Sequence, residues 1–183
     1  MKRLLQAIVL LLLLSATSAQ VHRHDPLTDE EIDQLRDTTQ LPEQRLKLLI
    51  TFARARLAPL DQPLKATDSA GRGREIHDHI EDFVALYDEI EDNIGMYVDH
   101  KEDLRKPLHQ IIAADEEFAA RFRHMREQAE TDAPSTTEAI RAEAREYSFV
   151  LSNASEAVGS ALTDHRKLLI EQEAEVQARK KRK

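Results

Sequence analysis

The sequence contains no cysteine and no tryptophan, and only 4% of its residues are aromatic. Without cysteine, the chain can form no disulfide, no thiolate zinc site, no cysteine nucleophile and no lipid attachment through an N-terminal cysteine. It has only 4 glycines and 6 prolines, so few tight turns are available. Because a β-sheet favours β-branched and aromatic side chains, this composition disfavours a sheet.

Charged residues make up 33% of the chain and hydrophobic residues 41%, with both signs of charge interspersed. Such a composition is typical of long amphipathic helices that bury a seam between them. A chain of 183 residues is expected to form one domain. The sequence therefore predicts an all-α fold, an elongated antiparallel helical bundle or hairpin of long amphipathic helices, with a single helical domain over residues 27–178.

Residues 1–19 have the pattern of a secretory signal peptide. Lys2 and Arg3 precede an apolar run over residues 4–14, which is too short to cross a membrane stably. Small residues follow, and we expect cleavage after Ala19; the alternative is an uncleaved N-terminal anchor. Cleavage predicts an exported protein, periplasmic or extracellular, with a net charge of about −10 in place of −8. So acidic a protein is not expected to bind nucleic acid.

Residues 20–26 are expected to form a flexible N-terminus that carries His22 and His24. Cleavage after Ala19 makes His22 the third residue of the mature protein. A free amine, two amide nitrogens and a third-position imidazole form a square plane that suits copper(II) or nickel(II). His22 is therefore the candidate metal ligand, against the alternative of a polar tail. Copper calorimetry on the mature protein and on its His22→Ala variant tests this hypothesis.

Two short helices are expected next. Thr28 and Glu31 form a capping box that opens a helix to about Arg36. A second helix is expected from about Glu43 to Leu57. Pro42 fits its start, because proline is tolerated in the first turn of a helix, and the helix should stop before Pro59. Its charges are mainly basic, so we expect it to dock on the acidic central helix, with apolar burial supplying most of the stability.

The central helix carries the clearest pattern of the chain. Its apolar residues recur in alternating steps of four and three, which predicts a buried heptad seam: Ile76, Ile80, Phe83, Tyr87, Ile90, Ile94 and Tyr97. Acidic residues lie between the seam positions, so the opposite face of this helix is expected to be anionic and exposed.

The heptad register continues past Pro107, through Leu104, Leu108, Ile111, Asp115 and Phe118. One interpretation is a single helix of about 60 residues with a proline kink. The other is a turn around residues 100–106 followed by a new helix from about Pro107. We prefer the kinked helix, because no glycine or asparagine between His100 and Pro107 supplies an ordinary helix stop.

The last helix is expected to follow a turn at residues 131–134, to run antiparallel to its predecessor and to end near Ala178. His165 occupies one of its seam positions and is interpreted as a rim residue bonded to a carboxylate or to water. The chain ends in a basic tail, residues 179–183. This tail is interpreted as a solvated helix end or as an attachment to an anionic envelope surface, through Arg179, Lys180, Lys181, Arg182 and Lys183.

Four segments of the chain, residues 45–49, 52–57, 81–90 and 103–108, resemble a group of uncharacterised, exported, helical bacterial proteins. The resemblance covers most of the mature chain. It implies bacterial export and a helical fold, and it implies no activity, so no site residue is carried over from it.

No arrangement of residues in the sequence predicts catalysis or a cofactor. No Gly-x-Ser-x-Gly elbow, phosphate-binding loop or calcium loop occurs, and no histidine has a glutamate three positions before it, as a di-iron bundle would need. We therefore expect a non-catalytic scaffold or interaction protein that presents its acidic helical face to a protein partner or to a second copy of itself. The alternative is a copper- or nickel-binding exported protein that uses His22.

Overall fold

The computed structural model describes residues 25–61, 71–131 and 138–182. These residues form the helices α2 (Asp29–Asp37), α3 (Pro42–Leu57), α4 (Arg72–Asp99), α5 (Arg105–Thr131) and α6 (Glu138–Lys181), with a short 3-10 helix at Ala58–Asp61. The prediction of an all-α fold is confirmed, since no strand occurs in these three ranges. The expected signal peptide and His22 lie outside the described residues.

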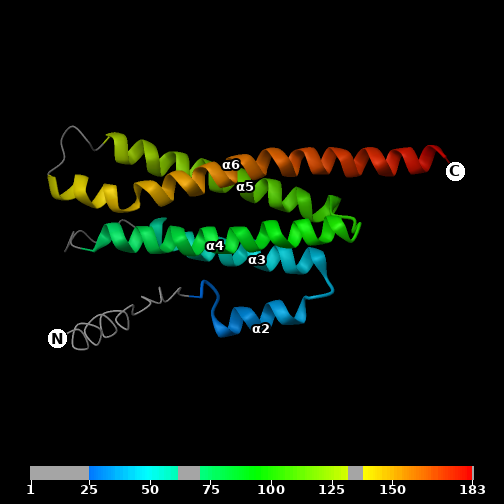
Figure 1. The fold of residues 1–183 in the computed structure, drawn as a ribbon, viewed down its shortest axis with the longest axis horizontal. Helices are drawn as coiled ribbons and strands as arrows, with labels where there is room; N and C mark the ends of the chain where they lie inside the picture. The colour runs from blue at the N-terminus through cyan, green and yellow to red at the C-terminus, as the bar shows by residue number, and fades with distance from the viewer. Residues whose placement is uncertain (1–24, 62–70, 132–137, 183) are drawn as a thin grey trace, which may run out of the picture.

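The four longer helices lie side by side along one direction (Figure 1). Helix α3 packs against α4 and α5, α6 packs against the other faces of the same two helices, and α2 packs against α3. We call the packed helices α3 to α6 the helical body. Helix α6 is much the longest at 44 residues, and its C-terminal end extends well past the other helices (Figure 1).

The core of the helical body is the predicted seam. Every apolar seam residue of α4 between Ile76 and Tyr97 is at most 5% exposed. Phe83 lies at the centre of an aromatic cluster, with ring centroids 4.9 Å from Phe118, 5.1 Å from Phe122 and 5.6 Å from Tyr87. Heptad spacing therefore identified the buried face of the central helix correctly, because apolar stripes at this spacing are hidden where helices pack.

Helix α3 docks on α4, as expected, and its inner face is buried. Its basic side chains, however, find carboxylates on other helices. Arg54 forms an ion pair with Glu117 of α5 at 2.7 Å, and Arg56 forms one with Glu31 of α2. Apolar burial brings α3 against α4, whereas these two arginines bind α3 to α2 and α5. The expectation that basic charge on α3 would meet the acid of α4 is not met by these two residues.

The preferred interpretation of Pro107, a kinked continuous helix, is wrong. Helix α4 ends at Asp99 and α5 begins at Arg105, so Pro107 lies in the first turn of a new helix, where its missing N–H breaks no helical hydrogen bond. The stop is made by Lys101, whose φ is +59°. Its N–H donates to the carbonyl of Val98, and the N–H of Glu102 donates to that of Tyr97. This is a Schellman ending, with a lysine where glycine is usual.

The left-handed conformation of Lys101 is expected to lower the stability of the folded chain. A residue with a Cβ pays roughly 1–2 kcal/mol in this conformation, whereas glycine adopts it freely. We therefore expect Lys101→Gly to raise the free energy of unfolding by about 0.5–1 kcal/mol, measured by urea denaturation. The control is Lys167→Gly at an exposed position inside α6, which should lower the free energy of unfolding by about 1 kcal/mol. Equal losses in both variants would contradict the prediction.

Helix α6 leaves the helical body at Gln172. The side-chain amide of this residue accepts a hydrogen bond from the N–H of Leu104 at 2.8 Å and donates one to the carbonyl of Glu102 at 3.2 Å. Beyond it, side chains are exposed apart from a half-buried Val176. We call residues 173–182 the projecting end of α6. Helix α6 ends at Lys181, three residues after the expected end near Ala178.

Candidate functional site

The structure does not bring the predicted site residues together. His22 lies outside the described residues, as does Lys183 of the basic tail. The other four residues of the tail, 179–182, are exposed at the far end of α6. An ion pair there joins Arg179 to Glu175 of the same helix at 3.3 Å.

A polar network that sequence reasoning did not predict lies inside the helical body. Asp115 of α5 accepts a hydrogen bond from the Tyr87 hydroxyl of α4 at 2.7 Å. Its second oxygen lies 2.8 Å from Nδ1 of His165 on α6. The other ring nitrogen of His165 lies 3.0 Å from a carboxylate oxygen of Glu91 on α4. Those last two atoms attract as charges without forming an aligned hydrogen bond. The network therefore joins three helices through one imidazole and one carboxylate.

Burial and charge set the protonation of this network. Asp115 is 1% exposed and His165 is 2% exposed. Burial alone lowers the pKa of His165, but the contacts with Asp115 and Glu91 outweigh it and raise the pKa to about 9. The imidazole is therefore cationic at neutral pH and donates to Asp115. Burial, together with the negative charge of Asp115, raises the pKa of the Tyr87 hydroxyl far above its ordinary value, so this group stays protonated.

The sequence did contain a signal for this network. His165 and Asp115 both occupy seam positions, in helices that were expected to be neighbours. Two ionisable side chains in adjacent seams can be buried only as a pair, because a lone buried charge is very costly. The interpretation of His165 as a rim residue was wrong, since the ring is enclosed; of the two partners expected for it, a carboxylate and water, the carboxylate is found.

The enclosed position of the network determines what it can do. A catalytic acid or base must reach the proton that it transfers. Asp115 and His165 are closed off from solvent, so no substrate contacts them while α4, α5 and α6 stay packed. A buried ion pair can instead specify how helices fit together. The geometry therefore favours a structural role for the network.

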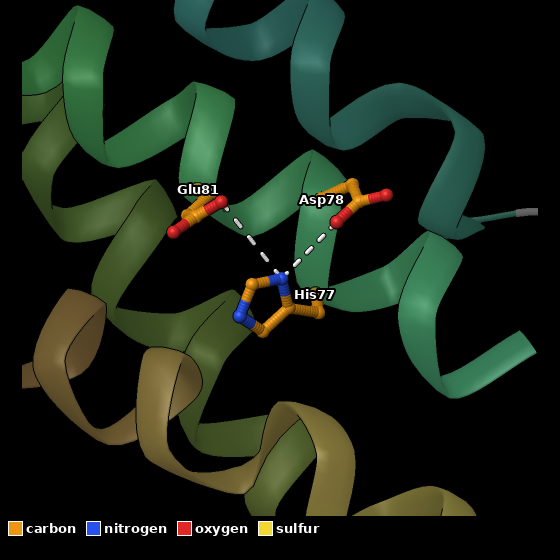
Figure 2. Close-up of side chains that lie close together, drawn as sticks. All are labelled: His77, Asp78 and Glu81. Atoms are coloured by element: carbon orange, nitrogen blue, oxygen red, sulfur yellow. Dashed lines mark hydrogen bonds and ion pairs between the residues drawn. The ribbon is translucent and has the colours of Figure 1, made fainter. Parts of the chain in front are cut away.

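A second cluster lies on the surface of α4 (Figure 2). Nδ1 of His77 lies 3.2 Å from an oxygen of Asp78 and 3.9 Å from one of Glu81. Among the described residues these three side chains form the one group whose donor atoms could meet at a metal ion. The two carboxylates are exposed, and Asp78 also lies 4.0 Å from the guanidinium of Arg74. With a neighbouring cation and no enclosing wall, the cluster suits hydration better than a bound metal.

The outer side of α4 carries exposed acidic side chains along its length. No lysine or arginine occurs between Glu75 and Asp99. Exposed carboxylates also occur at Glu75 and Glu89, but five others recur at helical spacing and so lie along one stripe. We call this stripe the acidic face of α4; its residues are Asp78, Glu81, Asp88, Asp92 and Asp99.

Comparisons with protein-family models, with curated proteins and with solved structures find no match to this chain. Within the described ranges, none of the helices is both long and apolar enough to cross a membrane.

Proposed function

We propose that this chain is a non-catalytic, exported helical scaffold that presents the acidic face of α4 to a basic surface of a protein partner. The observation that carries the proposal is the face itself. Over the 25 residues from Glu75 to Asp99 the chain places no lysine or arginine, although it has 26 of them in all. A single-sign stripe of this kind steers association with an oppositely charged surface.

The fold supports a stable presentation of this face. The seam of α4 is buried against α3 and α6, so its opposite side is held outward along the length of the helix. Arg54 and Arg56, two cations of the neighbouring helix α3, bind Glu117 and Glu31. The charge of these two arginines is thus directed to α5 and α2. The ionic network of Asp115 and His165 is enclosed, so recognition of a partner falls to the surface.

A photo-crosslinking experiment tests the proposal. Gly95 is exposed on α4 beside the acidic face, and a Cβ built on it would meet no atom within 4 Å. A crosslinking amino acid there should leave the fold intact and should capture the partner in a periplasmic or secreted extract. Gly159 on α6 is equally exposed and open, so the same amino acid at that position is the matched control.

The expected result is a crosslinked protein at Gly95 that is absent at Gly159. Capture should be lost when three acids of the face are reversed in Glu81→Lys, Asp92→Lys and Asp99→Lys. It should be kept when three exposed acids of α6 are reversed instead, in Glu146→Lys, Glu156→Lys and Asp164→Lys. Equal capture from the two glycine positions, or capture that survives reversal of the face, would refute the proposal.

A further inference from the structure

Exposed apolar side chains gather at one end of the helical body. Of the five large hydrophobic residues that are exposed in the described chain, four lie there: Leu41 (45% exposed), Met96 (41%), Val98 (38%) and Ile170 (65%). Three contacts bring their segments together at this end. Glu43 at the start of α3 binds Lys106 of α5 at 2.8 Å, Arg45 binds Asn93 of α4 at 2.6 Å, and Gln172 of α6 binds the turn between α4 and α5.

The projecting end of α6 leaves the molecule at this same place (Figure 1). From Gln172 to Lys181 the helix rises about 14 Å. The charge of Glu173 still acts on Arg105 at the start of α5, and beyond it the helix extends past the other helices (Figure 1). The seam of α6 continues into it, since Val176 follows His165, Leu169 and Gln172 at steps of four, three and four. The projecting end thus carries a seam residue, Val176, away from the end of the body where these four apolar side chains are exposed.

The charges of this segment are arranged in two blocks. Glu171, Glu173 and Glu175 come first, and the basic residues Arg179, Lys180, Lys181 and Arg182 follow. In an antiparallel pair of such segments centred near Gln177, Glu175 lies opposite Arg179 and Glu173 lies opposite Lys181. Val176 of each copy then lies in the contact, about 3 Å from its counterpart along the helix axis. A parallel pair would place each block against a block of its own sign.

We propose that the projecting end of α6 pairs antiparallel with the same segment of a second copy, so that each copy helps to cover the apolar end of the other. The segment is complementary to itself in charge, which fits a two-fold contact in which both copies use the same surface. Because the overlap is short, the dimer is held by its ion pairs as much as by apolar contact and dissociates as salt screens them. This surface is distinct from the acidic face of α4.

Light scattering after size exclusion, together with sedimentation over a range of protein concentrations, tests the pairing. The wild-type chain should dimerise, with a dissociation constant that rises about tenfold or more between roughly 0.05 and 0.5 M salt. Two variants separate the charge blocks. One carries Glu171→Lys, Glu173→Lys and Glu175→Lys; the other carries Arg179→Glu, Lys180→Glu, Lys181→Glu and Arg182→Glu. Each alone should be monomeric, and an equal mixture should form a one-to-one heterodimer.

The control is the α6 variant with Glu146→Lys, Glu156→Lys and Asp164→Lys, which should dimerise as the wild type does. Circular dichroism checks that each variant keeps its helix content. A monomeric wild type at low salt, or a mixture of the two block variants that stays monomeric, would overturn the proposal. So would a monomer that sediments with anionic vesicles through residues 179–182, since the basic block would then serve a lipid surface. None of these outcomes alters the crosslinking expected at Gly95.

Discussion

Asp115→Ala is expected to lower the free energy of unfolding by about 3–5 kcal/mol. The substitution removes the acceptor for the Tyr87 hydroxyl and the hydrogen-bonded carboxylate partner of His165, and both of these donors are enclosed. A buried donor without a partner costs about 1–3 kcal/mol, and more when it is charged. For a chain of this length, the loss corresponds to a fall of about 10 °C in Tm.

Glu116→Ala is the matched control for this variant. Glu116 is the next residue of α5, carries the same charge and also binds α6, through Arg166 at 2.6 Å, but both side chains of this pair are more than half exposed. Because exposed ion pairs contribute about 0–1 kcal/mol, this change should be small. Urea denaturation of the two variants measures the difference. Similar losses for Asp115→Ala and Glu116→Ala would show that the network contributes little.

The same network gives stability a pH dependence in the wild type. The pKa of His165 is raised from 6.5 to about 9, so the unfolded chain gives up this proton at lower pH than the folded chain does. Its contribution is therefore complete below about pH 6.5 and is lost as the pH rises to about 9. Stability measured over this window should decline in the wild type. The decline should be smaller in Asp115→Ala, where one of the two carboxylates that raise this pKa is removed.

Phe83→Ala is expected to cost about 3–5 kcal/mol through the cavity that it leaves. Phe83 is fully enclosed, and its ring meets three other aromatic rings at centroid distances of 4.9 to 5.6 Å. Such aromatic pairs add about 0.5–1.5 kcal/mol each to simple burial. The cluster joins α4 to α5, so its loss should weaken the contact between these helices as well as the seam of α4.

Phe149→Ala provides the comparison, since it makes the same chemical change at a phenylalanine that is 75% exposed on α6. A surface substitution of this kind usually stays within about 0.5 kcal/mol of the wild type. Guanidinium denaturation of both variants, with the slope of the transition compared, measures the two effects. If Phe83→Ala were as mild as Phe149→Ala, the aromatic cluster would not be the centre of the core.

Apolar spacing made most of the fold predictable. The capping box at Thr28 and Glu31 is present, and α3 starts with its proline and ends at Leu57, close to the expected limits. Each apolar position of the α4 seam is buried. These features depend on neighbours in the sequence and on the helical repeat, which can be read without knowing what lies across the interface.

The turn between α4 and α5 could not be read in this way. Its helix stop depends on Lys101 in a conformation that lysine rarely adopts, so the sequence carries no glycine or asparagine to mark it. The apolar positions of α4 and α5 also stay in one heptad register across the turn, and this favoured the interpretation as one kinked helix. The contacts of the neighbouring segments, including the hydrogen bond from Leu104 to Gln172, act over 68 residues and leave no local pattern.

The sequence places His165 and Asp115 at seam positions, but it does not show that these two residues meet. That His165 would meet Asp115 depends on which turns of α5 and α6 lie level, and the sequence gives no value for that alignment. The destination of Arg54 likewise depends on α5 lying beside α3. The suggested copper ligand His22, the signal peptide and the export of the chain remain predictions.

The apolar seam of α6 is so regular that apolar packing alone would allow α6 to shift along its neighbours by one heptad. A shift of one heptad would keep apolar groups facing the core but would bring Val158 or Gln172 into the place of His165. Asp115 would then be enclosed without a cation, so the shifted alignments are disfavoured. Each such step would also lengthen or shorten the overhang by about 10 Å. The buried pair of His165 and Asp115 thus fixes the alignment of α6 with α5, and with it the length of α6 that extends into solvent.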